Sequence, residues 1–208
     1  MMKTLVGVKM KTLVEVEMKK LVGVEMKRFQ EFAVDVTLDP ETAHPQLFLS
    51  DDGKQVKLDV MKNLPNNPER FTSCLYVLGK QSFSSGRFYF EVQVKGKTDW
   101  TLGVTRESVN RKGDIRLSPQ NGVWTVEWMN NSCNARDDPP VHLPLTSVPQ
   151  KVGVLVDYEE GLVSFYDVEA AALIYSFTGC SFWEKLLPLF SPGLHYFGRN
   201  SSPLIISP

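Results

Sequence analysis

The chain has 208 residues, of which 42% are hydrophobic and 23% charged, the balance of an ordinary soluble globular protein. A formal net charge of −1 at pH 7 excludes a field strong enough to collect nucleic acid by charge alone. No apolar run reaches the ~18 residues that span a membrane. Gly7, Lys9 and Lys11 break the first apolar run before it reaches signal-peptide length, so we expect a cytoplasmic protein without membrane insertion.

The residues that most often hold metals are widely scattered. They are Cys74, Cys133 and Cys180, and His44, His142 and His195. No Cys-x-x-Cys pair and no histidine pair at ligand spacing occurs, which argues against a zinc ribbon or a redox motif. We therefore expect free thiols in a reducing compartment, no metal site and no cofactor.

Residues 1–33 form a repeat of eight residues, with copies that begin at Met2, Met10, Met18 and Met26. Eight residues advance a helix by about 800°, so an apolar stripe would drift from copy to copy. A coiled coil needs a repeat of seven or eleven, and alternating apolar positions favour a strand over a helix. One hypothesis is a self-associating or partner-pairing segment. We favour the other, a low-complexity linker that is poorly ordered or weakly helical.

From residue 34 onward, short hydrophobic runs alternate with turn residues. We expect strands at 47–49, 88–94, 100–104, 123–129, 152–158, 162–168 and 170–177. The runs 152–158 and 162–168 flank Glu159-Glu160-Gly161 and predict a hairpin with Gly161 at positive φ. One helical turn is expected at 182–187. Many short strands with little helix indicate an all-β antiparallel sandwich or barrel.

Several segments together resemble the PRY-SPRY (B30.2) family. They are Leu-Asp-Pro at 38–40, GRFYFEVQV at 86–94, WTLGV at 100–104, VDYEEGLVSFY at 156–166 and LPLFSPG at 187–193. Phe90 stands where the family usually has Trp. The resemblance covers 34–208, with a PRY part at about 34–85 and a SPRY part at about 86–208. It implies a two-sheet antiparallel β-sandwich of the concanavalin-like jelly-roll type.

The resemblance also implies a non-catalytic module that recognises a protein target. Such domains lie at the C-terminus of tripartite-motif (TRIM) ubiquitin ligases, in butyrophilins and in other innate-immune proteins. This sequence has no cysteine–histidine cluster for a RING or B-box and no long heptad run. We therefore expect it to select targets for a ubiquitin-ligase assembly in trans, or to compete with one, rather than to carry ligase activity.

Asp157, Glu159 and Glu160 are the one tight carboxylate group in a strand setting. A sandwich glycosidase needs two carboxylates on one strand face, and Asp157 and Glu159 have that spacing. Glu159 and Glu160, however, lie at the expected hairpin tip, where acidic side chains are simply solvated. We expect no enzymatic activity.

Recognition is expected on the long connections of a rigid sandwich. These are 61–68, 107–121, 129–142 and 195–200. The partner-binding residues that we predict are Asn63, Asn66, Asn67, Arg111, Lys112, Asp114, Arg116, Trp128, Asn130, His195 and Tyr196.

Trp128 has two interpretations, since it ends a strand before a polar segment: an exposed hot spot or a buried core residue. The other tryptophans, Trp100, Trp124 and Trp183, are expected in or near the core.

Two alternative functions stay open. Arg111, Lys112 and Arg116 belong to a basic stretch that suits a phosphorylated small ligand, as some related butyrophilin-type domains bind, although a solvated loop is the favoured interpretation of each residue. It lacks the interleaved aromatic residues that stack nucleic-acid bases. A lectin-like carbohydrate binder is the other alternative, against which stands the absence of a clustered Asp/Asn calcium site.

Overall fold

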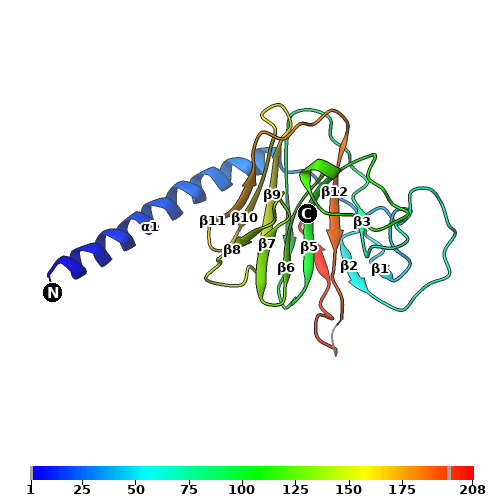
Figure 1. The fold of residues 1–208 in the computed structure, drawn as a ribbon, viewed down its shortest axis with the longest axis horizontal. Coiled ribbons are helices and arrows are strands. Elements are labelled where there is room, and N and C mark those ends of the chain that lie inside the picture. Colours follow the sequence, from blue (N-terminus) through cyan, green and yellow to red (C-terminus); the bar gives the residue numbers. More distant parts are fainter. Residues whose placement is uncertain (1, 196–197) are drawn as a thin grey trace.

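The computed structural model describes residues 2–195 and 198–208, with side chains from residue 10 onward. Two antiparallel sheets pack face to face, and one long helix extends away from them (Figure 1). The all-β, two-sheet sandwich expected from the sequence is confirmed.

Thirteen strands build the sandwich. In chain order they are β1 (Leu47–Leu49), β2 (Gln55–Leu58), β3 (Val77–Leu78), β4 (Arg87–Gln93), β5 (Trp100–Arg106), β6 (Val123–Met129), β7 (Ser132–Ala135), β8 (Val141–Leu143), β9 (Lys151–Asp157), β10 (Leu162–Asp167), β11 (Ala172–Phe177), β12 (Leu186–Ser191) and β13 (Leu204–Ile206). The first sheet has the order β1-β2-β13-β4-β9-β10-β11, and the second β3-β12-β5-β6-β7-β8. Two short 3₁₀ helices, η1 (Gln30–Phe32) and η2 (Pro119–Asn121), complete the elements beside the long helix.

The core lies between the two sheets and follows the alternation of each strand. In β5, Trp100, Leu102 and Val104 point inward and are fully buried. In β4, Phe88 and Phe90 do the same from the opposite sheet. The alternation that predicted the strands therefore also decides which side chains reach the core.

The hairpin predicted at 152–168 is present, with Leu162 opposite Asp157 and Gly161 at φ 62°. Two other expectations were wrong. The stretch 129–142 is not one long loop but contains β7 and the start of β8, since its backbone pairs with β6. The helical turn expected at 182–187 is absent, because the chain joins β5 from Leu186 onward.

Helix α1 (Met2–Phe29) replaces the strand that the alternation of residues 1–33 favoured. A helix satisfies its backbone groups within itself, whereas a projecting strand needs a partner strand. Figure 1 shows that only the C-terminal end of α1 reaches the sandwich. There Met26 is buried against Tyr89, Leu155 and Tyr166. The exposed apolar residues of the outer part are Met10, Leu13, Val14, Val16, Met18, Leu21 and Val24.

Candidate functional site

The outward face of the second sheet carries a row of polar side chains, which we call the polar row. Strand register places its members opposite one another across five strands: Ser191, Thr101, Glu127, Asn134 and His142. Neighbouring inward positions such as Leu102, Val126 and Cys133 belong to the core. The polar row therefore lies on a rigid sheet, which is a suitable base for a recognition site.

Glu127 is the central charge of this face. Its side chain is almost buried, and burial raises the pKa of its carboxyl group, with a further increase from Asp99. Arg136 opposes this increase, since its Nη1 lies 3.4 Å from Glu127 Oε1. A recessed carboxylate with a raised pKa is a marker of functional sites in general.

Two polar atoms beside Glu127 are buried without a partner. Thr125 Oγ1 and Arg136 Nε make no hydrogen bond within the part of the chain that the structure describes. Folded proteins pair almost all buried polar groups, so each exception needs an explanation. A bound molecule that supplies hydrogen bonds to this face is one such explanation.

One end of the face is bordered by the β6–β7 turn and by the segment that follows β12. Asn130 and Asn131 form the turn at φ 53° and 58°, a conformation that asparagine tolerates. Asn200 fixes the other segment, because its Nδ2 donates to Asp99 O at 3.0 Å and to Pro192 O at 2.8 Å.

The other end is bordered by the loops 61–76 and 107–118, which cover a second small core with Phe71 and Leu117. Lys112 Nζ joins them, since it donates to Asn66 Oδ1 at 2.9 Å and also to the carbonyl oxygen of Asn67. Arg111 donates to the carbonyl oxygens of Glu69 and Glu107, each at 3.1 Å. Both cations thus hold the two loops together, which the sequence did not indicate.

The remaining predicted contacts divide by exposure. Asn63, Asp114, Arg116 and Asn130 are exposed, and Arg116 Nη2 lies 3.7 Å from Asp138 Oδ1. His195 is half-buried beside the Asn200 segment. Tyr196 lies outside the described residues.

The expectation for Trp183 was wrong, and the structure decides between the two interpretations of Trp128. Trp128, placed among the predicted contacts, is 6% exposed and packs in the core. Alternate residues of a strand point to the same face, so Trp128 shares the inward face of β6 with Trp124 and Val126. This alternation was the signal in the sequence that Trp128 is buried. Trp183, expected near the core, is 68% exposed. It lies in no strand, and parity therefore could not place it.

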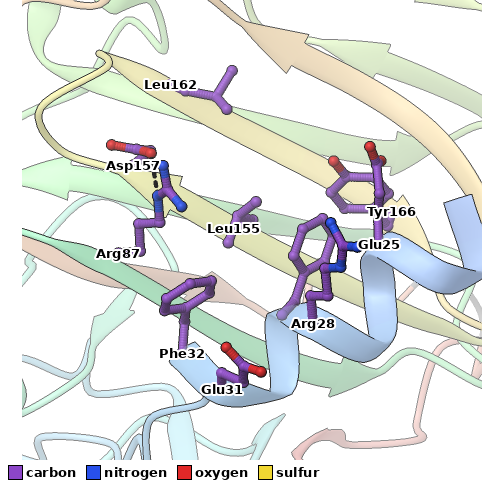
Figure 2. A pocket seen from close by; sticks show the side chains of 10 residues that line it. Glu25, Arg28, Glu31, Phe32, Arg87, Leu155, Asp157, Leu162 and Tyr166 are labelled. Atoms are coloured by element: carbon purple, nitrogen blue, oxygen red, sulfur yellow. Dashed lines mark hydrogen bonds and ion pairs between the residues drawn. The ribbon is translucent and has the colours of Figure 1, made fainter.

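Asp157 and Glu159, weighed above as a catalytic pair, have structural partners. Arg87 Nε donates to Asp157 Oδ2 at 2.5 Å, and Gly86 N donates to Glu159. Asp157 lines a groove of about 470 Å³ between α1 and the first sheet (Figure 2). Its charged lining is mixed in sign, with Arg28 among the cations and Glu25 among the anions, so it selects for neither.

Comparison with known proteins places this architecture in a family. A family model described as SPRY domain matches residues 87–202, and one described as SPRY-associated domain matches residues 36–83. The chain belongs to the PRY-SPRY (B30.2) family. The resemblance drawn from its sequence motifs is thereby confirmed, and the family supports a protein-interaction module.

Several curated members of the family are similar to the chain. Pyrin of Homo sapiens is 49% identical over 181 residues, which cover 86% of this chain and 23% of pyrin. The brain form of nuclear factor 7 of Xenopus laevis is 48% identical, over 80% of this chain and 28% of that protein. The E3 ubiquitin-protein ligase TRIM21 of Mus musculus is 44% identical, over 84% and 38%. The chain thus spans less than two-fifths of each of these relatives.

Two solved structures share the fold. The TRIM65 PSpry domain superposes with a TM-score of 0.74 at 24% identity, over 88% of this chain and 95% of that one. Stonustoxin gives 0.73 at 25% identity, over 85% and 29%. Among the described residues, no helix combines the length and the apolar character needed to cross a membrane.

Proposed function

We propose that this PRY-SPRY chain binds a protein target on the outward face of its second sheet. The contact surface comprises the polar row and the exposed predicted residues that border it, Asn63, Arg116 and Asn130 among them. The observation that carries the proposal is the recessed Glu127–Arg136 pair with two unpartnered atoms beside it, Thr125 Oγ1 and Arg136 Nε.

Binding on this face requires no chemical step. The sheet fixes the polar row, while the two sets of loops supply side chains that can differ without disturbing the core. A partner that inserts a polar group next to Glu127 satisfies atoms that are otherwise buried at a cost. The gain is specific, because a partner without that group leaves them unpaired.

The wider context that we propose is target selection in the cytoplasm, for a ubiquitin-ligase or innate-immune assembly. This rests on relatives such as the E3 ubiquitin-protein ligase TRIM21 and pyrin. No observation favours the phosphorylated-ligand alternative, since Arg111 and Lys112 are engaged in joining two loops. None favours a carbohydrate ligand.

The test is affinity capture from cytosol with three variants. Asn130→Gly removes a side chain and keeps the turn, Arg116→Ala removes an exposed cation, and Glu127→Gln removes the recessed charge. We expect the captured protein to bind about tenfold more weakly to at least one of them, as for a contact hot spot. Binding is measured by calorimetry with the purified partner.

Leu173→Asp is the matched control, because Leu173 is 50% exposed on β11 of the other sheet. It should leave the affinity unchanged. If the wild type and all four variants bind with equal affinity, or if only Leu173→Asp loses affinity, the proposal is contradicted. Recognition would then lie on the first sheet or on α1.

A further inference from the structure

A cavity lies between the two sheets, at the end where β5 finishes and β6 begins. Its volume is about 340 Å³, and it is lined by Arg106, Trp124, Asp137, Tyr175, Cys180 and Ser181. Arg106 continues the inward series of β5 after Trp100, Leu102 and Val104. A cation thus occupies a position that strand parity assigns to the core side.

Neighbouring residues hold the Arg106 side chain in this position. The residue is 9% exposed, and its guanidinium lies 5.3 Å from the ring centroid of Trp124 and 3.4 Å from that of Trp183. Gly122 makes room for its stem, since a Cβ at this position would come within 2.6 Å of Arg106 Cδ. Gly122 also has φ 72°, so glycine is required there twice over.

Two N–H donors of this cavity lack a strong acceptor among the described residues. Arg106 Nε is buried and meets no hydrogen-bond partner among residues 2–195 and 198–208, and in that range the buried Trp124 Nε1 has at most the Cys180 thiol as an acceptor. The Trp124 indole N–H is directed at the Cys180 sulfur, which is a weak acceptor. A buried donor without a strong acceptor needs an explanation, and an acceptor that binds in the cavity is one.

The carboxylates nearby are already used. Asp137 Oδ2 accepts a hydrogen bond from the Tyr175 hydroxyl at 2.6 Å. Glu184, the acidic group whose charge acts on Arg106, accepts from Ser108 N and Oγ. Arg106 itself donates through Nη2 to a neutral acceptor, Ser181 O, at 3.2 Å.

We propose that this cavity binds a carboxylate group of a peptide or protein, with Arg106 and Trp124 as its donors and the exposed Trp183 ring over Arg106. A carboxylate brings two strong acceptor oxygens, one for Arg106 and one for Trp124, and arginine is the residue best suited to receive it. The Asp137 carboxylate favours a ligand with a single negative charge, because it repels a doubly charged phosphate more strongly than a carboxylate. The source is an Asp or Glu side chain or a chain terminus.

The experiment is a titration followed by NMR of the indole N–H groups, of which the four tryptophans supply one each. The probes are N-acetyl-aspartate amide for a side-chain carboxylate and N-acetyl-alanine for a chain terminus. N-acetyl-asparagine amide is the neutral control, and sodium phosphate tests for a general anion effect. We expect saturable shifts of the Trp124 and Trp183 signals with at least one acid. The signals of Trp100 and Trp128, both in the core, are internal references.

Two variants sharpen the result. Arg106→Gln should weaken the acid about tenfold, the loss of one charge-assisted contact. Asp137→Asn keeps an oxygen for Tyr175 and removes the repelling charge, so it should tighten the acid several-fold and admit phosphate. This second variant keeps the test valid if Arg106→Gln fails to fold.

The proposal is overturned if the Trp124 signal stays unmoved by both acids. Equal shifts with the neutral amide, or with phosphate in the wild-type protein, overturn it as well. A shift with only one acid supports it and identifies the source of the carboxylate.

Discussion

Lys97 is 4% exposed, and its ammonium donates to Ser202 O at 2.7 Å. Burial lowers its pKa from 10.5 to about 8, although Asp99 opposes the change. In the unfolded chain the amine stays protonated up to about 10.5, so between these two values the folded protein binds fewer protons. The free energy of unfolding that this group contributes therefore rises with pH across that window.

Lys97→Met removes this dependence. The free energy of unfolding of the variant minus that of wild type should fall by more than about 1 kcal/mol between pH 7 and 10. Urea denaturation at a series of pH values measures it. A difference that stays constant over this range would mean that Lys97 is solvated.

Trp128 and Trp183 differ sharply in what their removal should cost. Trp128→Ala leaves a hole in the core and should lower the free energy of unfolding by about 3 to 5 kcal/mol. Trp183→Ala removes an exposed ring that stacks on Arg106, which is worth about 1 kcal/mol. Urea denaturation of both variants compares them. If Trp128→Ala is as stable as wild type, its burial is wrong and the hot-spot hypothesis regains support.

At the scale of elements, a strand could be predicted from the sequence when its alternation of apolar and polar residues was long enough. The seven-residue strands β4 to β6 were recognised because their alternation is long. β7 was missed, since Cys133 and Ala135 are its only inward residues and Asn130-Asn131 indicated a loop. The long helix was expected at most as a weak one, because an eight-residue repeat contains both even–odd alternation and helical positions. The lack of a pairing strand is what decides between them.

The attachment of α1 can be tested with a matched pair of methionines. Met26 is 7% exposed against Tyr89 and Tyr166, whereas Met18, one repeat earlier, is 54% exposed. Met26→Ala should lower the free energy of unfolding by about 2 kcal/mol, and Met18→Ala should change it by less than about 0.5 kcal/mol. Thermal or urea unfolding gives both values. Equal values would mean that the end of the helix does not dock.

At the scale of the whole molecule, the helix and the proposed binding face occupy opposite layers. Met26 packs on the first sheet, while Glu127 faces outward from the second. Deletion of residues 1–21 should therefore change the dissociation constant for the captured target by less than roughly twofold, as for independent sites. Calorimetry with the truncated chain checks this. A large loss would assign the repeat a share of the contact.

Sequence reasoning located the borders of the candidate face but not its centre. Polar loops such as 61–68 can be recognised from the sequence alone. Glu127, Arg136 and Asp99 meet only after β5, β6 and β7 pair in register, which no local pattern specifies. The bonds that Arg111 and Lys112 form between loops were not foreseen for the same reason, because carbonyl partners of both belong to a loop about 40 residues away.

The eight-residue repeat of α1 means that each copy adds a fixed length and a fixed rotation to the helix. Each copy advances about 12 Å along the axis and turns by about 80° beyond two full rotations. Gain or loss of one copy thus shifts both the reach and the azimuth of any group fused at the N-terminal end. Two copies point such a group roughly 160° away from its first direction. The number of copies therefore determines the distance and the direction of such a group, while the sandwich stays unchanged.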